Sequence, residues 1–368
     1  VDVRTLQENL MLRSAVASSF SVLVALGILS ASLVACSTDV LVTGSGTDPS
    51  TEPTPSGKPT TDPGTIPTSP PGVTPPVKVN RAWTNIALPA TGLSVASVAG
   101  SASDNVWIVA SAQGAGQRDP WTAYRFDGAK WSSFPLTATV GRPSFGVAVM
   151  GPQKVFLGFS YSADIFELDG GDFTKKAASF SVTSGYSMSR VGDQVFVGTQ
   201  ENFGSGPLYR YDGAKFGQVA VTQGSGGVFS VWGASTDDVW ISRSGGLGHL
   251  VAGKYEDGVL PAVGEVHGSA KDDVWAIGKD VGVQHYDGSK WSSVEFAGDK
   301  TKLVSVHAFA KDDVVVVADK VYRYDGKSFT VDTRANAPKV ASKHTSVGSD
   351  EAWYLADGQL VRLAPEGK

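Results

Sequence analysis

The sequence predicts an all-β fold made of seven similar units, and three observations support this prediction. A hydrophobic pair that follows a polar turn recurs seven times, at Val106-Trp107, Val155-Phe156, Val195-Phe196, Val239-Trp240, Val274-Trp275, Val314-Val315 and Ala352-Trp353. Successive pairs lie 49, 40, 44, 35, 40 and 38 residues apart, so the repeat is about 41 residues long. A glycine-containing turn followed by an aromatic residue recurs between the pairs. A repeat of this length, with short strands and tight turns, is typical of a β-propeller with four-stranded blades.

Each repeat contains four segments that we expect to be strands, named a to d here in chain order. The hydrophobic pair lies in strand b, and strand a precedes it, as in residues 228–232. Strand c combines aromatic and β-branched residues with period-two alternation, as in residues 321–324, which favours a strand over a helix. Two-residue hairpins are expected to join c to d at Asp127-Gly128, Asp169-Gly170, Asp212-Gly213, Ala252-Gly253, Asp287-Gly288 and Asp325-Gly326. Strand d opens with an aromatic residue, namely Trp131, Phe173, Phe216, Tyr255, Trp291 or Phe329.

The two ends of the repeat region are expected to complete one another. Only six d strands follow the seven sets of a, b and c, because the chain ends soon after residues 361–363, the c strand of the seventh set. Residues 81–86 have the pattern of a d strand, but no a, b and c strands precede them in the chain. We therefore expect an N-terminal strand to join the last blade of a propeller that spans residues 81–368, which removes exposed sheet edges.

The first eighty residues predict export and a lipid anchor. Residues 1–35 read as a signal peptide whose true start is Met11 or an alternative start codon at Val1. Residues 33–36, Leu-Val-Ala-Cys, resemble the bacterial lipobox, which implies that Cys36 becomes the acylated first residue of a mature lipoprotein, carrying chains such as palmitate. Ser37 favours the outer membrane. The alternative is a membrane-spanning helix with an incidental Cys36.

Composition limits the remaining possibilities. Residues 36–79 hold ten of the nineteen prolines among Thr, Ser and Gly, so we expect a disordered tether without a core. The net charge of −5 and the lack of a basic stripe argue against nucleic-acid binding. Cys36 is the single cysteine, so no intrachain disulfide forms. We expect a monomer that contacts the membrane only through its anchor.

Variable loops on one face of the propeller are the first candidate binding region, because connections between rigid strands often carry binding residues. In the first repeat, Arg118 and Trp121 lie in a b-to-c connection that no other repeat copies. Phe203 lies in the equivalent connection of the third repeat. Trp and Arg are common at interface hot spots, so these residues could contact a partner protein or a glycan. The alternative is that Trp121 packs on its own blade.

The axis of the propeller is the second candidate region. Eight residues before the second member of each hydrophobic pair stand Ala99, Ala148, Met188, Trp232, His267, His307 and Thr345. Trp232, His267 and His307 come from consecutive repeats, so they could line one side of a central channel, with His344 one residue from the equivalent position. The alternative is that they fill gaps between blades. No metal site is expected, because neither a carboxylate nor a third imidazole occupies that position, and no cofactor is expected.

The acidic pairs at Asp237-Asp238, Asp272-Asp273 and Asp312-Asp313 precede strand b, and we expect them to bond to turn backbone rather than to act as catalytic acids.

The repeats resemble those of secreted bacterial propellers and, distantly, the Asp-box repeats of sialidases, although Asp287 and Gly288 are adjacent where the Asp-box has a residue between them. The resemblance implies only a propeller. The predicted function is therefore an envelope lipoprotein, not an enzyme, that binds a protein or glycan. The alternatives are a sialidase-like glycosidase or a scaffold for envelope assembly.

Overall fold

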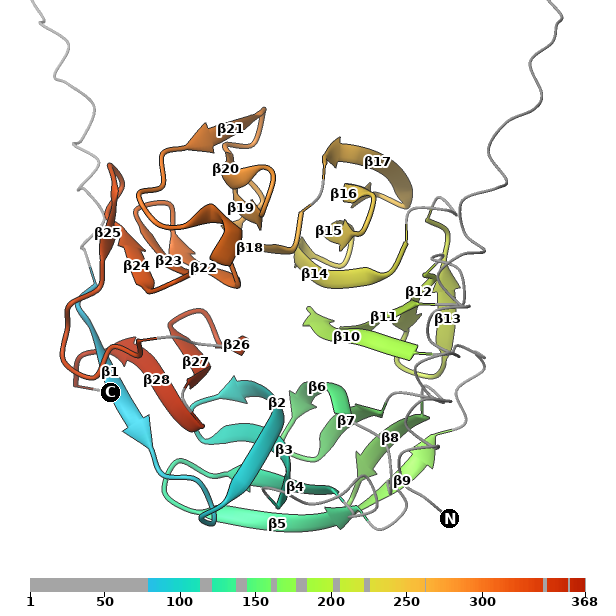
Figure 1. Cartoon of the computed structure of the whole chain (residues 1–368). Helices are drawn as coiled ribbons and strands as arrows, with labels where there is room; N and C mark the ends of the chain where they lie inside the picture. The colour runs from blue at the N-terminus through green and yellow to red at the C-terminus, as the bar shows by residue number, and fades with distance from the viewer. Residues whose placement is uncertain are drawn as a thin grey trace, which may run out of the picture. The chain divides into compact units, whose positions relative to one another are not determined.

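The computed structural model describes residues 79–112, 121–136, 144–159, 164–176, 184–200, 206–221, 226–261, 263–339, 343–356 and 358–367. These residues form seven antiparallel sheets of four strands each, arranged as blades around one axis (Figure 1). The predicted all-β, seven-bladed propeller is thus confirmed. Nearly all of the described secondary structure is strand, and the 3-10 turn at Lys300–Lys302 is an exception.

The first six blades each take four strands that are consecutive in the chain. Blades 1 and 2 contain β2 (Leu93–Ala102), β3 (Asn105–Ala112), β4 (Trp121–Phe126), β5 (Trp131–Leu136), β6 (Ser144–Gly151), β7 (Lys154–Phe159), β8 (Asp164–Asp169) and β9 (Asp172–Lys176). Blades 3 and 4 contain β10 (Ser184–Val191), β11 (Gln194–Gln200), β12 (Leu208–Tyr211), β13 (Phe216–Val219), β14 (Val228–Ser235), β15 (Asp238–Arg243), β16 (Gly246–Val251) and β17 (Lys254–Leu260). Blades 5 and 6 contain β18 (Glu265–Ala270), β19 (Asp273–Gly278), β20 (Gly282–Tyr286), β21 (Trp291–Val294), β22 (Ser305–Ala310), β23 (Asp313–Val317), β24 (Val321–Tyr324) and β25 (Phe329–Val331).

The seventh blade joins the two ends of the described chain, as predicted. It contains β26 (Lys343–Val347), β27 (Glu351–Ala356), β28 (Gln359–Pro365) and, on its outer edge, β1 (Arg81–Ile86). Strands β1 and β28 pair antiparallel from Arg81 opposite Pro365 to Ile86 opposite Leu360 (Figure 1). Because an early strand completes the last sheet, the ring is held closed by main-chain hydrogen bonds between distant parts of the chain.

The hydrophobic pairs of the sequence form the core between blades. Both members are buried because neighbouring residues of a strand face opposite sides of their sheet, and each sheet is covered on both sides. The second member packs toward the following blade: the ring of Trp275 lies 5.1 Å from that of Tyr324 and 6.1 Å from that of Phe329. Trp240 makes the same kind of contact with Trp291 at 5.2 Å. The aromatic residue that opens strand d is thus part of the packing between blades.

The Asp-Gly turns close the c–d hairpins as predicted, but in the first hairpin the two central residues are Gly128 and Ala129 rather than Asp127 and Gly128. Gly128 has a φ of +92°, and the N–H of Asp127 donates to the carbonyl of Lys130 at 3.1 Å. A positive φ at the first of two central residues suits glycine and matches the twist of the paired strands. The Asp127 carboxylate also accepts hydrogen bonds from the backbone of Ala129 and Lys130 at 3.0 and 2.8 Å. This fixed turn holds strand d against the blade.

The prediction for the paired acids was wrong for their second members, which bond to side chains inside the blade. Asp273 accepts hydrogen bonds from Trp275 Nε1 at 2.9 Å and lies 2.7 Å from His285 Nε2. Asp313 pairs with Arg323 of strand c and with Arg81 of β1 at 2.9 Å. The reason is strand register, since the second acid is already the first residue of strand b and faces the neighbouring strand c. These buried carboxylates are structural.

Candidate functional site

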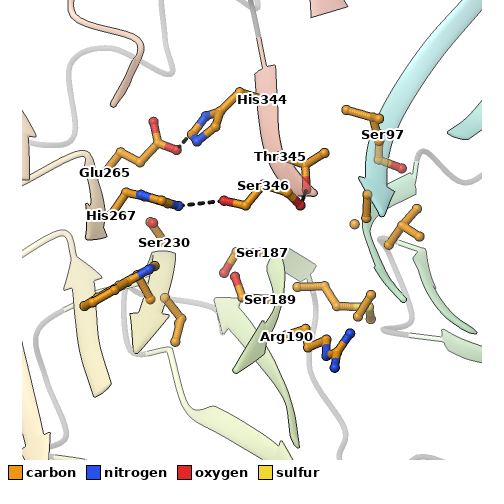
Figure 2. A pocket seen from close by; sticks show the side chains of 18 of the residues that line it. Ser97, Ser187, Ser189, Arg190, Ser230, Glu265, His267, His344, Thr345 and Ser346 are labelled. Atoms are coloured by element: carbon orange, nitrogen blue, oxygen red, sulfur yellow. Dashed lines mark hydrogen bonds and ion pairs between the residues drawn. The ribbon is translucent and has the colours of Figure 1, made fainter. Parts of the chain in front are cut away.

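A cavity of about 670 Å³ lies on the propeller axis. It is lined by the innermost strands of all seven blades, β2, β6, β10, β14, β18, β22 and β26, as Figure 2 shows for part of its wall. The innermost strands converge around the axis, so small side chains leave room there. The cavity thus belongs to the fold as a whole rather than to one blade.

Hydroxyl groups dominate the polar part of the wall. The lining includes Ser97, Ser101, Ser187, Ser189, Ser230, Ser305, Thr345 and Ser346. Several of these hydroxyls connect one inner strand to the next blade: Ser187 Oγ donates to the carbonyl of Val228 at 3.2 Å, and Ser230 Oγ to that of Val266 at 3.4 Å. These serines therefore hold neighbouring blades together and also present oxygen atoms toward the axis.

Of the three inner-strand candidates, Trp232 and His267 are among the residues that line the cavity, whereas His307 is buried and is not among them. All three stand opposite the second member of their hydrophobic pairs. In the third blade Ser189, not Met188, stands opposite Phe196. In the other six blades, a longer a-to-b turn or a bulge adds one residue between the two paired positions. Strands β10 and β11 are joined by a two-residue turn with no bulge next to it, so the residue opposite Phe196 precedes it by seven positions instead of eight. The cavity wall there carries a hydroxyl at this position.

Three histidines from consecutive blades meet beside the cavity. His267 of β18, His307 of β22 and His344 of β26 each offer a ring nitrogen, and these atoms lie within 4.8 Å of one another. The rings of His267 and His307 stack with centroids 4.2 Å apart, and the ring of His344 stands 5.9 and 5.5 Å from them. His344, which the repeat places one residue from the equivalent position, joins the pair. His344 is one residue out of register, so it faces back toward blade 6 and completes the group.

Glu265 adds a carboxyl group to this histidine cluster, which we define as Glu265, His267, His307 and His344. Its Oε1 atom lies 3.1 Å from His344 Nδ1 (Figure 2). Glu265 precedes His267 by two residues on β18, so the two side chains project from the same face of the strand. Glu265 was not predicted from the sequence, although this spacing was a usable signal.

Hydrogen bonds fix the proton on His267. Its Nδ1 accepts the backbone N–H of Ala308 at 3.1 Å, which leaves the ring proton on Nε2. Nε2 then donates to Ser346 Oγ at 2.6 Å (Figure 2), and that hydroxyl is left to donate toward His307 Nδ1 at 3.4 Å. Ser346 therefore links two imidazoles from different blades, and His307 is the more weakly bonded of the two.

Burial sets the ionisation of the cluster. It lowers the pKa of His267 to about 3, with the nearby His344 as a smaller cause, and it lowers the pKa of His344 to about 4. Burial likewise holds the pKa of His307 well below its ordinary value. It raises the pKa of Glu265 to about 8, against a hydrogen bond from the Val306 backbone that acts in the opposite direction. At neutral pH these shifts favour three neutral imidazoles and one protonated carboxyl group.

The loop candidates are only partly described. Trp121 is the first residue of β4, half-buried, and it packs against the core shared by blades 1 and 2, which is the packing alternative stated above. Arg118 and Phe203 lie outside the described residues, as does the whole segment that contains Cys36. The described part of the chain contains no helix long and apolar enough to span a membrane.

Comparison with known proteins supports the fold and names no family. No family model matches the chain, and no curated protein matches its sequence. Among solved structures, a catalytically inactive variant of virginiamycin B lyase from Staphylococcus aureus, with quinupristin, is similar at 12% identity and a TM-score of 0.59, covering 77% of this chain and 99% of the lyase. YCF48 bound to D1 peptide is similar at 14% identity and a TM-score of 0.56, covering 77% and 97%. The extracellular domain of BT4673 from B. thetaiotaomicron is similar at 14% identity and a TM-score of 0.58, covering 76% of this chain and 39% of that one.

These similarities correct one prediction. The sequence predicted a protein that is not an enzyme, but the similar structures include lyases as well as a peptide-bound protein. At 11 to 12% identity the lyases share the fold alone. One propeller architecture therefore supports both catalysis and binding, and function has to be argued from the cavity.

Proposed function

We propose that this chain is a lipid-anchored protein of the bacterial envelope whose propeller binds a peptide segment of a partner protein in its central cavity. The observation that carries the proposal is the axial cavity of about 670 Å³, which falls within the range of specific ligand sites. A wall with many hydroxyl groups can satisfy the N–H and C=O groups of a peptide.

Two exposed apolar residues add a place for an apolar side chain. Phe229 and Val304 line the cavity, and each has 41% of its surface exposed. Both also line a smaller adjoining pocket together with Leu303 and Ile277. Apolar anchors beside hydrogen-bonding groups are the usual composition of a recognition site. The peptide complex of YCF48 shows that a protein of similar fold takes a peptide ligand.

The glycosidase alternative receives no support from the cavity. Hydrolysis of a glycosidic bond by the common mechanism needs two carboxyl groups about 5 to 10 Å apart. Among the described residues that line the cavity, Glu265 is the one with a carboxyl group. The cavity therefore favours a peptide ligand over a glycosidic substrate.

The peptide proposal is tested by selecting binders from a displayed library of random peptides against the full chain. We expect Phe229→Ala with Val304→Ala to weaken the best selected peptide about tenfold or more, because apolar anchors carry much of the binding energy. The matched control is Val251→Ala with Val331→Ala, which removes side chains of 43% and 41% exposure outside the cavity and should change affinity less than twofold. Equal affinity of both double variants, or a glycan array that yields ligands where the peptide library yields none, would refute the proposal.

The anchor is tested separately in a bacterial host. We expect the full chain to partition into the detergent phase after extraction with Triton X-114, and Cys36→Ser to move it to the aqueous phase, because the thiol is the only site for acylation. Mass spectrometry of the mature N-terminus should show acylated Cys36. A wild-type chain in the aqueous phase with an unmodified Cys36 would exclude the anchor.

A further inference from the structure

The histidine cluster lies between blades 5, 6 and 7, beside the central cavity. Polar groups are costly to bury, and buried ones are usually kept only where every partner is satisfied. Here four titratable side chains gather from three blades, and His307 is only 2% exposed. One contact within the cluster, from Ser346 Oγ to His307 Nδ1, is long at 3.4 Å, so the His307 lone pair is weakly used.

We propose that His307, His344 and Glu265, with His267 beside them, bind a divalent transition-metal ion of the zinc class in the wall of the central cavity. Imidazole nitrogen and carboxylate oxygen are ligands that such ions take in proteins. The donor set of two imidazoles and one carboxylate is also the one with which zinc enzymes keep a fourth position open. Because His344 and Glu265 line the cavity, an open position would face its interior.

The distances suit a single ion after a small contraction. Bonds of about 2.0 to 2.2 Å around one zinc ion place neighbouring ligand atoms roughly 3 to 3.5 Å apart. Glu265 Oε1 and His344 Nδ1 are already 3.1 Å apart. The three ring nitrogens lie within 4.8 Å of one another, so the imidazoles need to approach by up to about 1.5 Å.

The hydrogen bonds of the cluster decide which imidazoles are free to bind the ion. His267 is the least suited to ligate, because its Nδ1 already accepts the Ala308 N–H. Its role is to hold Ser346 at 2.6 Å beside the site.

The test is titration of the purified full chain, stripped with a chelator, with Zn²⁺ in competition with a chromophoric chelator, and with Co²⁺ as a spectroscopic probe. We expect one tightly bound ion per chain and a Co²⁺ absorption spectrum of nitrogen and oxygen ligation without a thiolate band. His344→Ala and His307→Ala should each weaken Zn²⁺ binding about 100-fold or more, and Glu265→Gln about 10- to 100-fold.

The chain supplies matched controls. Its two other histidines, His249 and His285, pair with Asp238 and Asp273 in the blades at 2.7 Å, so their replacement by alanine should leave Zn²⁺ affinity within threefold. Circular dichroism without metal checks that each variant folds, and His344→Gln replaces His307→Ala if the latter does not. Absence of a stoichiometric Zn²⁺ site in the wild type would overturn the proposal. Equal losses in the His249 and His344 variants would overturn it too.

Discussion

Replacement of Trp83 by alanine is expected to lower the free energy of unfolding by about 3 to 5 kcal/mol, the usual cost of removing a buried aromatic side chain. Trp83 is 3% exposed, its ring lies 5.2 Å from that of Tyr354, and its Nε1 donates to Asp332 at 2.9 Å. Asp332 directly follows β25, the outer strand of blade 6. The side chain of Trp83 therefore fastens the closing strand to two blades at once.

Equilibrium unfolding in guanidinium chloride measures this effect. Thr84→Ala is the control, because Thr84 is exposed on the same strand and its replacement should change stability by less than about 0.5 kcal/mol. A loss below about 1 kcal/mol for Trp83→Ala would show that β1 contributes little to ring closure. The same experiment thus measures how strongly the two ends of the described chain are coupled.

The second large effect is a stability maximum slightly below neutral pH, measured in the presence of a chelator. Below pH 6.5 the unfolded chain binds protons on three histidines whose folded pKa values are lowered, so stability falls as the solution becomes more acidic. Glu265 acts in the opposite sense, since its folded pKa is raised from 4.5 to about 8. The folded chain keeps this proton where the unfolded chain has lost it, so stability falls as pH rises from 4.5 toward 8.

Substitutions can separate the loss of stability on the acid side from the loss of stability on the alkaline side. Between pH 4.5 and 6.5 three imidazoles outweigh one carboxyl group, so stability should rise with pH there. Between pH 6.5 and 8 the Glu265 contribution should lower it by about 2 kcal/mol, as 1.4 kcal/mol per pH unit implies. Glu265→Gln should abolish that decline, and His344→Phe should flatten the acid side. A decline that persists unchanged in Glu265→Gln would show that another group causes it.

Strand order and blade packing were predictable because they depend on local signals that repeat. The Asp-Gly turns need positive φ at glycine, and the pairs such as Val274-Trp275 have to be buried on both faces of their strand. Counting back from the hydrophobic pair selected Met188 instead of Ser189, because a single shorter turn shifts the register of one blade, which spacing alone does not reveal. The prediction that the paired acids bond to turn backbone was wrong for a related reason, because Asp273 and Asp313 already belong to the strand rather than to the turn.

The candidate site was only half predictable. Spacing from the hydrophobic pairs selected His267 and His307, and the two-residue separation of Glu265 from His267 was available but unused. His344 and Ser346 could not be assigned by the repeat, because they join the site through contacts between different blades.

By itself, the sequence determined that this protein is a closed ring of seven blades, since each repeat carries its own turn, buried pair and aromatic contact, and residues 81–86 supply the missing strand. Only the tertiary structure decided what stands at the axis. The inner strands of all seven blades converge there, so residues far apart in the sequence become neighbours, such as His267 and Ser346, which are 79 positions apart. Their burial then changes the pKa values of side chains that the repeat pattern alone treats as interchangeable.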